Sequence, residues 1–472
     1  MPFKIVVLPT DACIYFLLIV SIIYLLIARK REHLRMPWRR IARNRIAVAS
    51  FTILGFFVLI GLLDSVHFRL ALPAAAGQPV PYSAEVKSVL DLILGNAANR
   101  DEKTYSAPFA THLFSKETTL LPNGKEVRIY PKLEYVTGES VTQVIWQSTL
   151  IALAKTIIIG CFIAVVFWFF IVIKRRLKRP KPLDNKTYPE DKTLVFQRQI
   201  RNSFITFGIT LSLLLFLSFF CLQLEQHYHI FGTDKVGVDV FYIAIKSVRT
   251  ALILGTLTTL FTLPFALFLG TMAGYFGGLI DDIIQYLYIT LSSVPGVLLI
   301  AASVLALEIF ISNHPSLFDN IAARADARLL ALCMILGLTS WTSLCRLLRG
   351  ESLKLRELDY VQAARALGVS HIRIIMRHIM PNAMHIVLIA LVLDFSGLVL
   401  AEAVLTYVGV GVDPTTYSWG NMINSGRLEL AREPVVWWPL LAAFVLMFTL
   451  VLTANLVADI VRDAFDPRVR EG

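Results

Sequence analysis

The stretch that decides the fold runs from Glu357 to Pro381 and reads ELDYVQAARALGVSHIRIIMRHIMP. Residues 352–367 are good helix formers, and Gly368 follows them where a left-handed residue ends a helix. Ser370 is suited to cap a second helix, and Pro381 then breaks or kinks the chain at the edge of an apolar block. The stretch therefore predicts two short helices with a bend between them, lying beside a membrane.

Long apolar blocks flank this stretch. Hydrophobic residues make up 56% of the 472 positions and charged residues only 17%, whereas a soluble protein is about a quarter charged. A helix needs about 20 apolar residues to cross the hydrocarbon layer of a bilayer. Nine blocks qualify, at about 12–28, 46–64, 148–173, 203–223, 248–274, 283–310, 328–347, 384–408 and 436–458. We therefore expect an all-α polytopic membrane protein with about nine spans and a small extracytoplasmic insertion.

The Lys and Arg residues set the expected orientation. The net charge of +11 is concentrated in short segments beside the apolar blocks, at 29–45, 174–202, 348–383 and the C-terminal tail. All four fall on one side if the N-terminus is outside, and short basic loops stay in the cytoplasm. We therefore predict an outside N-terminus, a cytoplasmic C-terminus and a retained first helix rather than a cleaved signal peptide. The same placement argues against nucleic acid as a partner.

The apolar blocks and the regions between them divide the chain into five parts. These are an extra first helix with a basic segment (1–45), a second helix (46–64), an extracytoplasmic insertion (65–147), a transmembrane hairpin with a basic linker (148–228) and a C-terminal core (229–472) that contains the loop 352–381. Within the insertion, Asn123-Gly124 supplies the positive φ of a tight hairpin turn. Pro264 and Pro295 predict kinks in their helices.

The opening stretch resembles the cytoplasmic EAA loop of ABC importer permeases, whose pattern is Glu-Ala-Ala-x-x-x-Gly followed further on by Pro. Gln362-Ala363-Ala364, Gly368 and Pro381 stand at these positions, with Gln362 in place of the usual Glu. The resemblance implies a coupling helix that docks into a groove of a separate ATPase subunit. It gives that coupling role to Tyr360, Gln362, Ala363, Ala364, Arg365, Gly368, Arg377 and Pro381. The alternative is an ordinary amphipathic helix at the membrane interface.

Further matches to the dipeptide, oligopeptide and nickel group of these permeases cover about 37–64 and 229–468. Residues 229–241 resemble the outer-face sequence HxFGTDxxGRDxF of the group, with Val238 in place of Arg. A second outer-face match begins at Trp419. The outer-face residues that carry the resemblance are Gly232, Thr233, Asp234, Gly237, Asp239, Trp419 and Asn421.

The resemblance also implies a bacterial inner-membrane assembly. The closing Asp466-Pro467-Arg468 is typical of the C-type subunit, whose partners are a B-type permease subunit, two cytoplasmic ATPase subunits and an extracytoplasmic substrate-binding protein. The expected function is the pore of an ATP-driven importer for peptides or peptide-like solutes, with alternating access. Because the sequence has no phosphate-binding loop, we expect no enzyme activity and no cofactor in this chain, with ATP and Mg²⁺ bound by the partner ATPases. The alternative is a secondary, ion-coupled transporter, although we find no internal repeat of the kind such folds contain.

Polar residues near or within the apolar blocks are the remaining candidates. Asp394 and Glu402 lie eight residues apart, about 12 Å along a helix, and we expect them to share one polar face. A membrane carboxylate indicates a transport pathway by default, and the alternative is a structural hydrogen bond or ion pair. His227 and His229 form a close pair, but two ligands without a third make a poor metal site, so no metal is expected. The five cysteines show no paired spacing and are expected to be free thiols.

Overall fold

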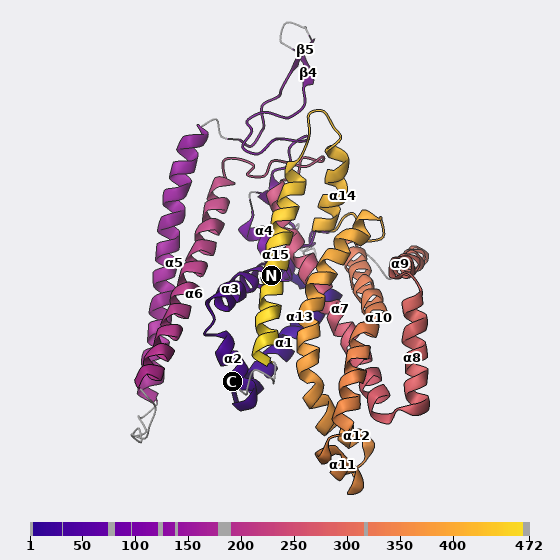
Figure 1. The fold of residues 1–472 in the computed structure, drawn as a ribbon. Helices are drawn as coiled ribbons and strands as arrows, with labels where there is room; N and C mark the ends of the chain where they lie inside the picture. Colours follow the sequence, from indigo (N-terminus) through magenta and orange to yellow (C-terminus); the bar gives the residue numbers. More distant parts are fainter. Residues whose placement is uncertain are drawn as a thin grey trace.

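Helices form most of the structure, because a chain in a bilayer must satisfy its backbone hydrogen bonds internally. The computed structural model describes residues 3–30, 32–73, 81–95, 97–120, 126–136, 140–177, 190–315 and 320–465. Figure 1 shows long helices packed side by side, with a β-hairpin at one end and short helices at the other. In chain order the elements are β1 (Phe3–Val6), α1 (Pro9–Lys30), α2 (Glu32–Ile41), α3 (Arg45–Asp64), β2 (His67–Leu70), β3 (Lys87–Ser88), α4 (Val89–Ile93), η1 (Ala97–Asn99), β4 (Glu117–Leu120), β5 (Glu126–Ile129), α5 (Val141–Leu177), α6 (Glu190–Leu224), α7 (Val240–Phe276), α8 (Gly278–Ser293), α9 (Gly296–Asn313), α10 (Ile321–Arg356), α11 (Asp359–Ala366), α12 (His371–Ile374), the π-helical stretch η3 (Ile375–Ile379), α13 (Met380–Tyr407), α14 (Trp419–Glu429) and α15 (Trp438–Phe465).

Eight helices in the described part of the chain are long and apolar enough to cross a membrane: α1, α3, α5, α6, α7, α9, α13 and α15. The predicted single span 283–310 is wrong. Val294 is extended, with φ −83° and ψ 130°, and Pro295 has no N–H to continue a helix, so α8 ends and α9 begins separately. The predicted block 328–347 forms the centre of α10, which carries charged residues toward both ends and is not among the eight.

The helices α7 and α10 form the most extensively packed pair among the described elements. Glycines bring these helices close together. A Cβ added at Gly270 would lie 2.8 Å from the carbonyl oxygen of Cys345, and one added at Gly274 would lie 2.5 Å from the carbonyl oxygen of Arg349. Such contacts through small residues are typical of membrane helix pairs. Around this pair, α13 packs against α7 and α15, and α3 packs against α7, α15 and α6.

The end of the molecule that carries the strands is called the hairpin side below. The N-terminal strand β1 pairs antiparallel with β2, which places Phe3 opposite Leu70 and Val6 opposite His67. β2 also pairs with β3, and the separate hairpin β4–β5 extends beyond the helices in Figure 1. The predicted hairpin is confirmed in its strands, while its turn at 121–125 lies outside the described residues. The N-terminal strand therefore lies on the same side as the insertion.

The helices α5 and α6 form a pair at one edge of the molecule (Figure 1). α6 packs on α3 and joins the pair to the rest of the structure. With 37 and 35 residues, both helices exceed the roughly 20 residues that a bilayer requires. Residues 178–189 of the predicted basic linker between these helices lie outside the described residues, as does the closing Asp466-Pro467-Arg468.

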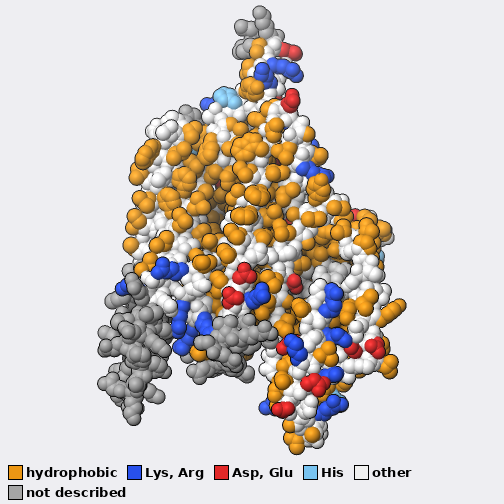
Figure 2. All heavy atoms as spheres, viewed as in Figure 1, with side chains coloured by type: hydrophobic (Ala, Val, Ile, Leu, Met, Phe, Trp, Pro, Cys, Tyr) orange, Lys and Arg blue, Asp and Glu red, His pale blue; other side chains and the backbone are white. Residues whose placement is uncertain are grey.

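The surface of the molecule is that of a membrane protein. Figure 2 shows hydrophobic side chains spread across the long helices, while many of the charged side chains gather toward the end opposite the hairpin. We call that end the foot side, and residues 357–381 the foot. Large exposed hydrophobic side chains are numerous on α1, α5 and α6, where contact with lipid accounts for their exposure.

Candidate functional site

The foot joins α10 to α13 through a sharp turn. Gly368 has φ +73°, the left-handed conformation that the sequence predicts. Its N–H donates to the carbonyl oxygen of Arg365 at 3.1 Å, and the N–H of Val369 donates to that of Ala364 at 3.1 Å. These bonds end α11 and direct the chain into α12. The predicted pair of short helices with a bend is therefore present.

Two local predictions about the foot are wrong. Ser370 stands at the N-cap of α12 with an extended backbone, but its side chain makes no capping hydrogen bond. Pro381 lies in the first turn of α13 and does not break the chain. The π-helical stretch η3 precedes it, and the N–H of Met380 donates to the carbonyl oxygen of Ile375, so the helical path continues. We call the continuous segment α12–η3–α13 the rod.

A buried valine anchors α11 to the rod. Val361 is 2% exposed and lies in one core cluster with Ile374 and Ile379, which are fully buried. At the edge of this cluster, Asn382 Nδ2 donates to Tyr360 Oη at 2.8 Å. Because α11 and the rod share packed atoms, a force applied to α11 reaches α13 without passing through a loose loop.

The other face of the foot is open to solvent. Of the residues with a predicted coupling role, Tyr360, Gln362, Ala363, Arg365, Gly368, Arg377 and Pro381 are exposed and Ala364 is half-buried. Large apolar side chains also face outward, with Leu367 83% and Ile372 74% exposed. Between α11 and the end of α7 lies a hollow of about 660 Å³. Exposed apolar groups beside charges and a hollow are typical of a surface that binds another protein.

The foot also contacts the ends of α7 and α10. The Tyr275 hydroxyl lies 2.8 Å from His371 Nδ1, and the Phe276 ring centroid lies 5.7 Å from that of His371. Two turns before the end of α10, Arg349 donates twice to the Asp281 carboxylate, at 2.5 and 2.7 Å. This hydrogen-bonded guanidinium holds the pKa of Asp281 below its ordinary value. The base of the foot is therefore fixed to α7, and α10 is fixed to α8 nearby.

Five of the predicted outer-face residues, from Gly232 to Asp239, lie just before α7, where they contact the insertion. Gly232 and Gly237 both have positive φ, at 65° and 88°. A Cβ at Gly237 would overlap the carbonyl group of Glu102 in the insertion, so only glycine fits this approach. Thr233 Oγ1 donates to the carbonyl oxygen of Thr104 at 2.8 Å and accepts from the N–H of Ser106 at 2.6 Å.

The two aspartates of this segment serve the local backbone. Asp239 is fully buried and caps α7, accepting from the N–H of Phe241 at 2.7 Å and contacting His229 Nδ1 at 2.5 Å. Asp234 Oδ1 accepts from the N–H groups of Val236 and Val238, both at 2.9 Å. Burial raises the pKa of Asp234 above its ordinary value. These contacts stabilise the segment, which connects α7 to the insertion.

The second outer-face pair holds the loop between α13 and α14. Trp419 is 2% exposed, and its indole N–H donates to the carbonyl oxygen of Ala244 at 2.9 Å. Asn421 Nδ2 donates to the carbonyl oxygens of Asp413 and Thr416 at 3.0 and 2.9 Å. Both side chains are therefore committed to contacts within the protein.

Asp394 and Glu402 do not share one polar face, contrary to the sequence prediction. Asp394 is exposed, whereas Glu402 is only 3% exposed. Eight residues rotate a helix by about 80° beyond two full turns, which is enough to separate the two side chains. Glu402 Oε1 accepts from Thr406 Oγ1 at 3.0 Å, and the carboxylate also hydrogen-bonds to Ser418 and to the backbone of Gly420 at the start of α14. Glu402 thus joins α13 to α14, while Asp394 remains open to the surroundings.

Comparison with known proteins agrees with this arrangement. Residues 266–471 match the family described as "Binding-protein-dependent transport system inner membrane component". The oligopeptide transport system permease protein OppC of Bacillus subtilis is 30% identical over 243 residues, which cover 52% of this chain and 73% of that protein. The chain belongs to this family of transport permeases.

Two further permeases are similar to this chain over more than half of its length. The OppC protein of Mycobacterium bovis is 29% identical over 59% of this chain and 95% of its own length. The dipeptide transport system permease protein DppC of Lactococcus lactis is 29% identical over 52% of this chain and 66% of its own length. A structure of the MetNI methionine ABC transporter in inward-facing conformations aligns with 48% of this chain at 15% identity and a TM-score of 0.37, covering 97% of its own chain.

The family assignment and the eight candidate spans agree with the predicted all-α polytopic membrane fold, and the family assignment confirms the predicted permease function. It is a family of transport components rather than of catalytic subunits. The family match contains the whole foot but begins within α7, so the N-terminal helices and the insertion lie before it.

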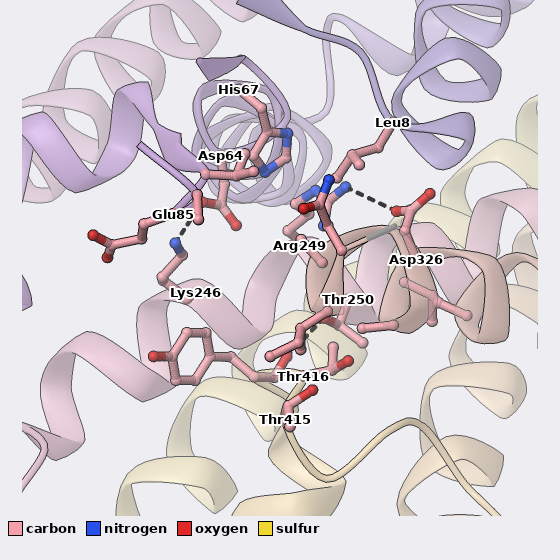
Figure 3. Close-up of a pocket in the computed structure, with 18 residues that line it drawn as sticks. Leu8, Asp64, His67, Glu85, Lys246, Arg249, Thr250, Asp326, Thr415 and Thr416 are labelled. Atoms are coloured by element: carbon pink, nitrogen blue, oxygen red, sulfur yellow. Dashed lines mark hydrogen bonds and ion pairs between the residues drawn. The ribbon is translucent and has the colours of Figure 1, made fainter. Parts of the chain in front are cut away.

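Sequence reasoning missed one feature of this permease. On the hairpin side, a cavity of about 590 Å³ is lined by acidic and basic side chains of α3, α7 and α10 (Figure 3). A signal was present in the sequence, because Lys246 and Arg249 stand three residues apart at the start of an otherwise apolar helix. Their partners are remote in the chain, so the pattern alone does not identify them.

Proposed function

We propose that this chain is the pore-forming permease subunit of an ATP-driven importer for peptides or peptide-like solutes. Relatives named for oligopeptide and dipeptide transport support the choice of substrate class. In this proposal the chain pairs with a second permease of the B type, two cytoplasmic ATPase subunits and an extracytoplasmic binding protein that delivers the solute. ATP and Mg²⁺ bind to the ATPase subunits, and this chain holds no cofactor.

The main support for this proposal comes from the structure of the foot. Its outward face presents Gln362, Ala363 and Arg365 beside the exposed Leu367, and its inward face is anchored by the buried Val361. An ATPase groove that covers the apolar side chains would remove them from water, a favourable contribution of about 25 cal/mol per Å². Closure of the ATPases then moves α11, and the shared core transmits the motion to the rod and to α13. The spans swing between inward- and outward-facing states.

The orientation follows from the positions of the basic segments. The foot and its arginines lie in the cytoplasm, and the hairpin side with the N-terminal strand lies outside. The N-terminal strand β1 supports this orientation because it pairs with β2 of the insertion. In a bacterium the membrane is the cytoplasmic membrane.

The exposed carboxylate of α13 belongs to the transport pathway in this proposal. Asp394 forms no ion pair with any described residue, and it faces away from the core that surrounds Glu402. An intramembrane carboxylate that forms no ion pair with the described residues of its chain meets either the solute path or the second permease. Glu402 has the structural role, since its hydrogen bonds hold the start of α14.

A proline substitution in the foot tests the proposal. Gly368 has φ +73° and its N–H donates to Arg365, whereas proline requires a φ of about −65° and has no N–H. In proteoliposomes with the partner subunits, Gly368→Pro is expected to reduce ATP-dependent peptide uptake at least tenfold while the chain remains folded. The matched control is Gly350→Ala in α10, where an added Cβ meets nothing within 4 Å and uptake should stay within about twofold.

An ion-coupled secondary transporter is not favoured, because the chain belongs to a family of binding-protein-dependent systems. The same preparation separates the two functions. Uptake by this chain alone, driven by an ion gradient and insensitive to Gly368→Pro, would overturn the proposal.

A further inference from the structure

Half of the residues that line the charged cavity on the hairpin side precede the family match at 266–471, and the other half lie within it. Figure 3 shows Lys246 and Arg249 of α7 on one wall, Asp326 of α10 beside them, and Asp64, His67 and Glu85 from the segments around β2. Thr415, Thr416 and Tyr417 of the loop before α14 close another side. Its volume of about 590 Å³ lies within the range of small-molecule sites.

Two groups of ion pairs surround the cavity. In the first, Lys246 Nζ lies 2.7 Å from Asp91 Oδ1 and 3.4 Å from Asp64 Oδ1. In the second, an Arg249 guanidinium nitrogen lies 2.7 Å from Asp11 Oδ1 and 3.6 Å from Asp326 Oδ1. The exposed fraction of all these side chains is 12% or less.

The two groups leave an excess of negative charge. Four buried carboxylates share the two permanent cations Lys246 and Arg249, and His67, which lies 2.8 Å from Asp11, adds positive charge only when it is protonated. Glu85 at the rim is paired with Lys87 at 3.8 Å, and its side chain is 70% exposed. Buried charge of one sign that exceeds its counter-charge attracts a cation into the adjoining space.

The lining suits an organic cation better than a metal ion or an anion. The described residues contain no group of three or more His, Cys, Asp or Glu side chains placed to hold a metal ion. An anion would have to compete with carboxylates for both Lys246 and Arg249. The Tyr417 ring already accepts an ammonium, since Lys246 Nζ lies 5.6 Å from its centroid. The hydroxyl oxygen of Thr416, buried and without a hydrogen-bond partner in the described structure, adds an unused polar group beside the cavity.

We propose that this cavity binds a small solute through a primary ammonium group, with the Asp64 carboxylate as its principal partner. A free amine and the N-terminus of a short peptide share this chemistry. The site is separate from the foot, and its occupation requires neither ATP nor an ATPase. Its test therefore measures binding alone, and the failure of one proposal leaves the other standing.

The test is calorimetric titration of the full-length chain in lipid nanodiscs. The probes are putrescine, glycylglycine, N-acetylglycylglycine and MgCl₂. We expect putrescine or glycylglycine to bind with one site per chain and N-acetylglycylglycine not to bind. Tighter binding of putrescine assigns the site to free amines, and tighter binding of glycylglycine assigns it to peptide termini; either result supports the proposal.

Substitutions that remove a negative charge and a positive charge, in separate variants, distinguish a binding site from a structural cluster. Asp64→Asn keeps an acceptor for the Ser88 hydroxyl, 2.7 Å away, and should weaken binding at least about tenfold. Lys246→Met frees two carboxylates and should strengthen binding, whereas a merely structural role predicts a loss in both variants. Glu85→Gln at the solvent-exposed rim provides a variant that is expected to fold and should weaken binding about two- to fivefold.

The control is Glu117→Gln in β4, an acidic residue far from the cavity lining that pairs with Lys103 at 3.8 Å. It should leave the dissociation constant unchanged. Equal binding of N-acetylglycylglycine, preferential binding of Mg²⁺, or an Asp64→Asn variant with native affinity would each overturn the proposal.

Discussion

The contact of α7 with α10 at Gly274 gives the sharpest prediction for the structure around the foot. A Cβ at this position would lie 2.5 Å from the carbonyl oxygen of Arg349, 2.5 Å from Ser352 Cβ and 3.1 Å from the backbone nitrogen of Leu353. Two of these neighbours are backbone atoms, which cannot rotate out of the way as the end of a side chain can. Gly274→Ala must therefore move the two helices apart.

The magnitude follows from two opposing terms. Inserting a methyl group into a packed interior costs about 1–3 kcal/mol, and the upper part of this range applies where backbone must move. Replacing a helical glycine by alanine stabilises the helix by about 0.5–1 kcal/mol. We therefore expect Gly274→Ala to lower the free energy of unfolding by about 1–2 kcal/mol.

Thermal unfolding of the purified chain in detergent measures this effect. The matched control is Gly208→Ala in α6, where an added Cβ meets nothing within 4 Å, so only the helix-propensity gain remains and the melting temperature should stay or rise. Because Tyr275 is the next residue and contacts His371 of the foot, Gly274→Ala should also lower ATP-dependent uptake. A Gly274→Ala chain that melts at or above the temperature of the native chain would refute the close packing of α7 on α10.

Two further predictions concern carboxylates. Asp281→Asn removes the paired hydrogen bonds to Arg349 and should lower the free energy of unfolding by about 1–3 kcal/mol. Because the folded pKa of Asp281 is lowered from 3.8, the native pair stabilises the fold fully above pH 3.8 and loses this contribution as the pH falls through the folded pKa. Acid unfolding curves of the variant should lack this pH dependence. Glu402→Ala should lower the free energy of unfolding by about 1–3 kcal/mol, because it leaves donors of α14 unpaired. Asp394→Asn should change the free energy of unfolding by no more than about 0.5 kcal/mol and should reduce uptake instead. Unfolding and uptake assays on both variants check these predictions. Native uptake by Asp394→Asn would exclude Asp394 from the pathway.

The two short helices of the foot and the turn between them could be predicted from the sequence, because they depend on local residue preferences. Helix formers, a glycine in the left-handed region and a following apolar block each act within a few residues, so the turn at Gly368 was predictable. The continuous path through Pro381 was not predictable, because no sequence rule signals the π-helical stretch η3, whose Ile375 and Ile379 are buried in the core. The burial of Val361 likewise depends on the neighbouring helices.

Contacts between distant parts of the chain account for the other differences. The outer-face segment was recognised by its residues, but its burial comes from the insertion, as in the contact of Thr233 with Thr104. The charged cavity was missed because Asp11 and Arg249 are 238 residues apart, and no periodicity connects them. The kink predicted at Pro295 in block 283–310 is a complete break between two helices, because the backbone of Val294 is extended.

The central claim is that the exposed face of the foot binds a nucleotide-driven subunit. A cysteine introduced as Ala363→Cys, in a chain whose exposed Cys161 is replaced by serine, tests it directly. In whole cells the new thiol should resist a membrane-impermeant maleimide, and in inverted vesicles it should cross-link to the ATPase subunit with a yield that changes on ATP binding. Labelling of Ala363→Cys from outside intact cells, or the absence of any nucleotide-dependent cross-link in the assembled transporter, would contradict the account.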